Sequence, residues 1–248
     1  MRTIFTFIYK IYALFLLGIL LLITIVTSFP LSLFGEQGRR YLWYVFRFCN
    51  RIWFLLVGIR IQVEMKQGEE TFNKRKKYIF IANHSSYMDT QLYFGNCPCP
   101  FKILGAKEYA KVPIFGFFYK QLAVLVNRND KESRQKSISQ LNETLEKGWN
   151  VLLLPEGGIK ADQQLLSPFY KGAFSLAKKN NLSILPIVFP DTLKRVPNGS
   201  LWNINPGICR VIILPEIKAK DNDSVESFKK RIFQKMNETI ENANSSKD

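Results

Sequence analysis

Histidine is nearly absent from this sequence: its 248 residues include a single one, His84. Cysteine is scarce as well, with four residues: Cys49, Cys97, Cys99 and Cys209. The Cys-Pro-Cys-Pro segment lacks the two-residue gap of a zinc knuckle or a redox motif, and no second cysteine or histidine pair could complete a metal site. We therefore predict no metal and no cofactor, and we interpret the cysteines as free thiols in a reducing compartment.

Three common catalytic motifs are missing. There is no G-x-S-x-G elbow of a serine hydrolase, no G-x-x-x-x-G-K phosphate loop and no G-x-G-x-x-G turn. Ser85 adjoins the histidine in sequence and is poorly placed to be polarised by it. The single histidine thus has no evident protein nucleophile to activate, which favours activation of a hydroxyl group on a bound substrate.

Acidic residues are few, with 20 against 35 basic residues and a net charge of +15. This balance favours an anionic partner, such as nucleic acid, an anionic membrane or a phosphorylated substrate. No recognised nucleic-acid motif accompanies the charge, so we predict no nucleic-acid partner. The hydrophobic fraction of 47% excludes a disordered chain.

Charged residues are absent from residues 11–35. A helix over residues 11–29 would span roughly 28 Å, which approaches the thickness of a bilayer core. No small-residue cleavage site follows it, so residues 1–35 are predicted as a retained membrane segment rather than a signal peptide. Pro30 is expected to interrupt the helix, and basic residues on both sides leave its orientation open.

Residues 36–58 are predicted to form an amphipathic helix at the membrane interface. Arg40, Arg47 and Arg51 share one helical stripe, while Trp43 and Trp53 belong to an otherwise apolar surface. The alternative is a helix of the folded domain with a large buried face.

From residue 59 onward, short apolar runs alternate with helix-like stretches. Strands are predicted over residues 61–65, 78–82, 101–104, 123–126, 151–154, 184–188 and 211–214, and helices over 86–95, 113–121, 131–147, 170–180 and 224–242. Several of the strands are continuously apolar, as expected when both faces of a sheet are covered. The order predicts an α/β fold with a mainly parallel mixed sheet in one domain, residues 59–248.

His84 follows a predicted strand after the single turn-forming residue Asn83, at a strand end where open α/β sheets place their sites. Asp89 comes five residues later, in the first turn of the next helix, from which a carboxylate could reach one imidazole nitrogen. It would then fix the tautomer and stabilise the imidazolium formed on proton abstraction. The alternative is that Asp89 only completes a capping box with Ser86.

Three further segments carry residues suited to an anionic substrate. Arg128 ends another strand and offers a bidentate donor for phosphate. The alternative is a solvated arginine in a loop, which would have the same sequence pattern. Glu156 and Gly157 follow a third strand, where glycine lets backbone approach a ligand, although the segment could be a simple turn. Lys171 stands at a helix start, a natural position for an anion.

Taken in order, these segments resemble the motifs of one family, the 1-acylglycerol-3-phosphate acyltransferases, across roughly residues 59–214. Residues 83–89, NHSSYMD, resemble the N-H-x-x-x-x-D signature. The later matches are LVNR at 125–128, LPEG at 154–157, PFYKGA at 168–173 and ILPIV at 184–188.

The resemblance implies an α/β domain anchored by N-terminal apolar helices, on the cytoplasmic face of a membrane. It implies transfer of a fatty acyl group from acyl-CoA or acyl-carrier protein to 1-acylglycerol 3-phosphate, giving phosphatidic acid without an acyl-enzyme. His84 would be the base and Asp89 its partner. The implied substrate-binding residues are Asn83, Arg128, Glu156, Gly157, Lys160 and Lys171, and the implied partners are the acyl donor, a lysophospholipid acceptor and membrane lipid.

One position departs from the family pattern. The third motif usually continues Thr-Arg-Ser, whereas this sequence reads Gly158-Ile159-Lys160. Ile159 stands where the arginine is expected, so one phosphate donor is missing unless Lys160 replaces it. Two alternatives therefore stay open: another acceptor, such as lyso-ornithine lipid, or a non-catalytic protein of the same fold that binds anionic membranes.

Overall fold

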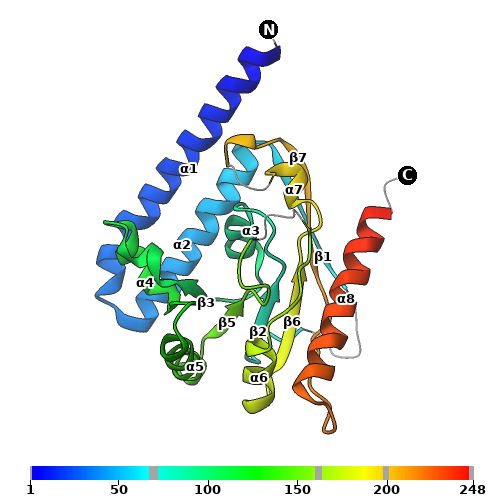
Figure 1. The fold of residues 1–248 in the computed structure, drawn as a ribbon. Coiled ribbons are helices and arrows are strands. Elements are labelled where there is room, and N and C mark those ends of the chain that lie inside the picture. The colour runs from blue at the N-terminus through cyan, green and yellow to red at the C-terminus, as the bar shows by residue number, and fades with distance from the viewer. Residues whose placement is uncertain (1, 67–71, 160–163, 198–200, 246–248) are drawn as a thin grey trace.

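The computed structural model describes residues 2–66, 72–159, 164–197 and 201–245, which form a sheet with helices on both faces (Figure 1). The strands are β1 (Ile59–Met65), β2 (Tyr78–Ala82), β3 (Phe101–Ala106), β4 (Ala123–Val126), β5 (Asn150–Leu153), β6 (Ser183–Val188) and β7 (Gly207–Ile213). The helices are α1 (Arg2–Ser32), α2 (Gly35–Leu56), α3 (Asp89–Asn96), α4 (Phe115–Leu122), α5 (Lys131–Glu146), α6 (Gly172–Lys179), α7 (Thr192–Arg195) and α8 (Val225–Ser245), with short 3-10 turns η1 (Lys107–Lys111) and η2 (Leu201–Asn203).

The strand order in the sheet is β1-β7-β6-β2-β5-β3-β4. Every neighbouring pair is parallel except β6 and β7, which run antiparallel. All five residues of β2 are buried, as the continuous apolar run predicted. The α/β fold with a mainly parallel mixed sheet is therefore confirmed.

The sheet separates two apolar clusters because successive side chains of a strand point to opposite faces. Tyr78 and Phe80 of β2 pack on the side of α1, α2, α3 and α4. Ile79 and Ile81 pack on the other side, with α5, α6 and α8. The cavity described below opens within the first cluster, between the sheet and the N-terminal helices.

Helices α1 and α2 form an antiparallel hairpin beside the sheet (Figure 1). The Tyr9 hydroxyl donates to the carbonyl of Val57 at 2.8 Å, and Trp53 Nε1 donates to the carbonyl of Ala13 at 2.9 Å. Residues Ile4–Ser32 are long and apolar enough to cross a membrane, which suggests membrane association. The expected break at Pro30 is wrong, because α1 continues through it to Ser32.

Helix α2 is built into the core on one side, which corrects part of its predicted role. Trp43 and Trp53 are fully buried rather than interfacial. Arg47 Nη1 donates to the carbonyl of Cys97 at 2.6 Å, and Arg51 Nε donates to that of Gly95 at 2.9 Å, so these two arginines face α3 and not lipid headgroups. The periodicity showed that they share a stripe, but not what that stripe contacts. The division into segments 1–35, 36–58 and 59–248 stays a prediction.

Candidate active site

The carboxyl ends of three parallel strands bring the predicted site residues together. Residues 83 and 84 follow β2, Glu156 follows β5 after a short turn, and Arg128 follows β4. Strands β2 and β5 are neighbours, and β3 lies between β5 and β4. Parallel strands end at the same edge of a sheet, so segments far apart in sequence meet there.

His84 and Asp89 are in contact. His84 Nδ1 lies 3.1 Å from Asp89 Oδ2, the imidazole is 15% exposed and the carboxylate is fully buried. Asp89 Oδ2 also accepts hydrogen bonds from the backbone N–H groups of Ser85 at 2.8 Å and Ser86 at 2.9 Å. The carboxylate therefore binds backbone N–H groups of the turn before α3 and also orients the imidazole ring. A capping role and a catalytic supporting role for Asp89 are thus compatible. With Nδ1 turned to Asp89, Nε2 is the nitrogen left to take a proton from a substrate.

Asn83 holds the loop of His84 in place from inside the protein. Its Nδ2 donates to the carbonyls of Leu165 and Phe189, each at 3.1 Å, and its Oδ1 accepts from the N–H of Phe189 at 2.8 Å. The side chain is fully buried. The structure thus gives Asn83 a supporting position behind the histidine, in place of the direct substrate contact that we expected.

Glu156 supports the same loop. Its Oε1 accepts the backbone N–H of His84 and its Oε2 accepts that of Ser167, both at 2.8 Å. The side chain is 1% exposed, and burial raises the pKa of Glu156 to about 7, against the opposing effect of the two backbone donors. Both carboxylate oxygens are engaged by the chain, so Glu156 is placed to fix the histidine rather than to touch the acceptor.

Arg128 lies at the rim of the site, exposed, and donates through Nη1 to the carbonyl of Gly157. Gly157 has a φ of 78°. A Cβ there would come within 2.7 Å of the Tyr170 ring, so glycine is required both by conformation and by space. The structure therefore brings Arg128 and Gly157 together beside the histidine, and their predicted substrate contacts stay predictions.

The structure describes one of the two predicted lysines, and that one does not join this group. Lys171 is exposed at the start of α6 and lies outside the residues that line the cavity. Lys160 lies outside the described residues. Ile159, at the position of the family arginine, lines the cavity.

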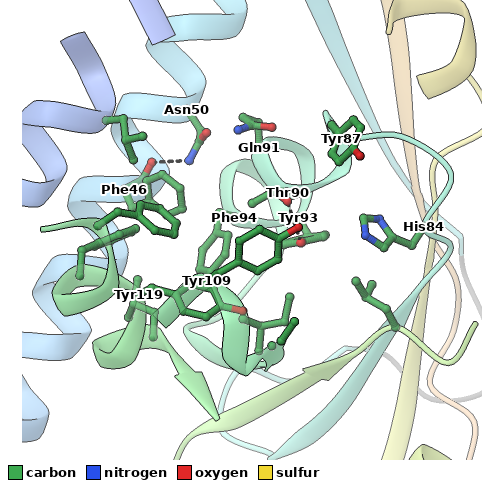
Figure 2. Close-up of a pocket in the computed structure, with 18 of the residues that line it drawn as sticks. Phe46, Asn50, His84, Tyr87, Thr90, Gln91, Tyr93, Phe94, Tyr109 and Tyr119 are labelled. Atoms are coloured by element: carbon green, nitrogen blue, oxygen red, sulfur yellow. Dashed lines mark hydrogen bonds between the residues drawn. The ribbon is translucent and has the colours of Figure 1, made fainter. Parts of the chain in front are cut away.

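A cavity of about 530 Å³ opens next to His84. Figure 2 shows His84 and Tyr87 on one side of it, Phe46 and Tyr119 on the other, and Thr90, Tyr93 and Phe94 between them. Its remaining walls are mainly aliphatic and aromatic side chains of α1, α2 and α4. Such a lining suits an acyl chain, with the polar groups gathered at the end near the histidine.

The apolar part of this cavity was missed from the sequence. Leu17, Leu20 and Leu21 of α1 line it, although their segment was interpreted purely as a membrane anchor. Their spacing of three and four residues places them on one helical face, which is the signal that could have marked them. Among the described residues, no group of three or more His, Cys, Asp or Glu side chains could hold a metal ion.

A single histidine held by a carboxylate beside an apolar cavity is an arrangement suited to acyl transfer. A family model described as Acyltransferase matches residues 63–190, about half of the 248 residues. The chain belongs to this acyltransferase family.

Several proteins similar to this chain bear the name 1-acyl-sn-glycerol-3-phosphate acyltransferase. A protein of Chlamydomonas reinhardtii is 29% identical over 84% of this chain and 62% of its own length. A Saccharomyces cerevisiae protein is 28% identical over 87% of this chain and 71% of its own length. A chloroplast protein of Brassica napus is matched over 63% of its length. The chain therefore spans a little over three fifths of the length of the Chlamydomonas reinhardtii and Brassica napus proteins.

The fold matches a solved structure. The crystal structure of the 1-acyl-sn-glycerophosphate acyltransferase PlsC from Thermotoga maritima superposes with a TM-score of 0.81, over 98% of each chain. Its sequence is 22% identical, so this likeness establishes the shared fold, including its N-terminal part.

Proposed function

We propose that this protein transfers a fatty acyl group from an acyl thioester to the free hydroxyl of 1-acylglycerol 3-phosphate, giving phosphatidic acid. The observation that carries the proposal is the 3.1 Å contact between His84 Nδ1 and the buried Asp89 at the mouth of an apolar cavity. The names of the relatives support the same reaction and acceptor.

The proposed mechanism uses His84 as a general base. Nε2 takes the proton of the acceptor hydroxyl, and the oxygen attacks the thioester carbonyl to give a tetrahedral intermediate. Its collapse breaks the carbon–sulfur bond, and the thiolate takes the proton back from the imidazolium. Asp89 holds the ring in one tautomer and stabilises its charge. No protein nucleophile takes part.

Arg128 is proposed to bind the phosphate of the acceptor, since a guanidinium at the rim of the site matches that group in charge and shape. The donor is proposed to be acyl-CoA or acyl-carrier protein. Both donors are anionic and occur in the cytoplasm, which agrees with a net charge of +15 and with a catalytic domain at the cytoplasmic face of a membrane.

The base assignment is tested with His84→Ala in a thiol-release assay, using acyl-CoA and 1-acylglycerol 3-phosphate. We expect the rate to fall by roughly 10²–10⁴-fold, because that is the usual contribution of a general base. The exposed Lys235→Ala serves as the matched control and should retain the wild-type rate. A His84→Ala enzyme that keeps more than about a tenth of the rate would show that another group is the base.

A different acceptor is favoured by one observation, Ile159 lining the cavity at the position of the family arginine. A panel of 1-acylglycerol 3-phosphate, uncharged monoacylglycerol and lyso-ornithine lipid, read by lipid mass spectrometry, separates the candidates. If phosphate is recognised, Arg128→Gln should raise KM for 1-acylglycerol 3-phosphate by about tenfold or more and leave KM for monoacylglycerol unchanged. Preference for an acceptor without phosphate, and indifference to Arg128→Gln, would favour the alternative.

A further inference from the structure

The segment made of η1 and the three residues that join it to α4 presents large apolar side chains to solvent. Tyr109 is 53% exposed, Val112 46% and Ile114 64%. Pro113 between them is exposed as well. Single apolar residues on a surface are ordinary, but a group of this size within six residues marks an interaction site. We call residues 107–114 the tip.

The backbone of the tip is held in a rare conformation that turns an isoleucine outward. Ile114 has φ 62° and ψ −54°, and the N–H of Phe115 donates to the carbonyl of Pro113 at 2.6 Å. These values describe a γ-turn of the rare type, which is strained and especially unfavourable for a β-branched residue. Glycine would suit this conformation better, so folding alone does not explain an isoleucine at this position.

Basic residues surround these apolar side chains. Lys107, Lys111 and Lys120 are exposed on the tip and on α4, against one exposed acidic neighbour, Glu108. Apolar side chains that can enter the headgroup region, ringed by lysines, are typical of surfaces that bind anionic lipid.

The tip also continues the exposed apolar face of α1. Phe29 of α1 stacks on Phe117 of α4 with ring centroids 4.5 Å apart, and α4 lies against α1 in Figure 1. Leu22 and Val26, on the same helix, are each 58% exposed. Tyr109 meanwhile lines the cavity beside His84. A bilayer that covers α1 would therefore meet the tip and the cavity wall on the same side.

We propose that the tip is a second membrane-contact element, which inserts Tyr109, Val112 and Ile114 into the surface of an anionic phospholipid bilayer. Lys107 and Lys111 contact lipid phosphates there. The tip thereby keeps the cavity open toward the bilayer, so a lipid substrate can enter without crossing water. A bilayer is favoured over a protein partner because the same surface joins α1 and carries an excess of lysine.

A fluorescent label at the tip tests this placement in the full-length protein. Cysteine is introduced by Ile114→Cys, or by Ile138→Cys on α5, which is 45% exposed and lies on the opposite face of the sheet. The four native cysteines are buried, so an environment-sensitive maleimide should label the new thiol selectively. In phosphatidylcholine vesicles containing phosphatidylglycerol, we expect label 114 to shift to the blue and to be quenched by spin-labelled lipid, unlike label 138.

Two results of this experiment would overturn the proposal. One is emission from position 114 that stays as in water and is not quenched, as at position 138. The other is a blue shift that depends on protein concentration and not on vesicles, because it would identify a protein partner. The fluorescence does not depend on the proposed reaction, so its outcome stands even if acyl transfer is not observed.

A paired variant tests the consequence for substrate entry. Val112→Thr with Ile114→Asn removes most of the apolar surface, and asparagine adopts a positive φ more readily than isoleucine, so folding should be preserved. We expect about a tenfold lower rate on acceptor in vesicles, from the loss of two inserted aliphatic groups, and an unchanged rate on dispersed short-chain acceptor. Ile138→Gln should change neither rate. Equal losses on both forms of acceptor would contradict a role at the membrane.

Discussion

Glu156 connects the histidine loop to a segment that lies far away in the sequence. It accepts backbone hydrogen bonds from His84 and Ser167 while almost fully buried, and this burial raises its pKa to about 7. In the unfolded chain the pKa lies near 4.5. Between about pH 4.5 and 7 the folded protein therefore holds a proton that the unfolded chain has lost. This proton favours the folded state at low pH, and its contribution to the free energy of unfolding is lost as the pH rises through that window.

Glu156→Gln tests this linkage because glutamine cannot titrate. As the pH rises from 5 to 7.5, the melting temperature of the wild type should fall relative to that of the variant, because the variant has no carboxyl group at position 156 to titrate. The variant should also lose roughly 1–3 kcal/mol at every pH, since its amide N–H₂ must face a backbone donor. Differential scanning calorimetry across the pH range measures both effects, with the exposed Glu238→Gln as control. Parallel curves for wild type and Glu156→Gln would contradict the raised pKa.

At this scale, sequence predicts local contacts and misses distant ones. The contact between His84 and Asp89 spans five residues and follows from a strand end and a helix start. Glu156 lies 72 residues from His84, and Phe189 lies 106 residues from Asn83. Spacing along the chain carries no information about such pairs, so both polar residues were assigned to the substrate instead of the backbone.

The secondary-structure elements were largely predictable, but their partners were not. All seven strands were predicted near their observed positions, several of them from continuous apolar runs, which are typical of central parallel strands buried on both faces. The arginine stripe of α2 was found by periodicity, but its contact with α3 depends on tertiary packing. Arg47 lies over the Trp43 ring at 5.2 Å, and burial lowers its pKa because the charged guanidinium loses solvent.

Arg47→Met tests the contact between α2 and α3. Methionine keeps much of the side-chain length but cannot donate to the carbonyl of Cys97, a residue that is 1% exposed. We expect the free energy of unfolding to fall by roughly 1–3 kcal/mol, the usual result of leaving a buried acceptor unpaired. Thermal and urea unfolding measure this loss, and Arg60→Met, at an exposed position on β1, is the matched control. An equal effect at both positions would show that the α3 contact adds nothing specific.

At the scale of the whole molecule, the packing of α1 limits how the protein can sit in a membrane. The helix is bound to the rest of the fold from Tyr9, through Ala13, to Phe29. Were it to cross the bilayer, α2 would cross beside it and carry Arg47 and Arg51, further along α2, into the hydrocarbon, which is costly. The length and hydropathy of α1 permit a span, but its contacts favour a position in the plane of one leaflet, with its exposed face toward lipid.

This position predicts that both ends of the chain lie on the same side of the membrane as the candidate active site. Epitopes are appended before Met1 and after Asp248, and sealed membrane vesicles of either orientation are treated with an impermeant protease. Both epitopes should be removed in one orientation, which is the one that exposes the cytoplasmic face if the proposed location is correct, and both should survive in the other. Vesicles opened with detergent show that each epitope can be cut. If α1 crossed alone, separated from α2, the two epitopes would give opposite results, because the N-terminus would then be on the far side while the sheet, and with it His84, stayed on the near one.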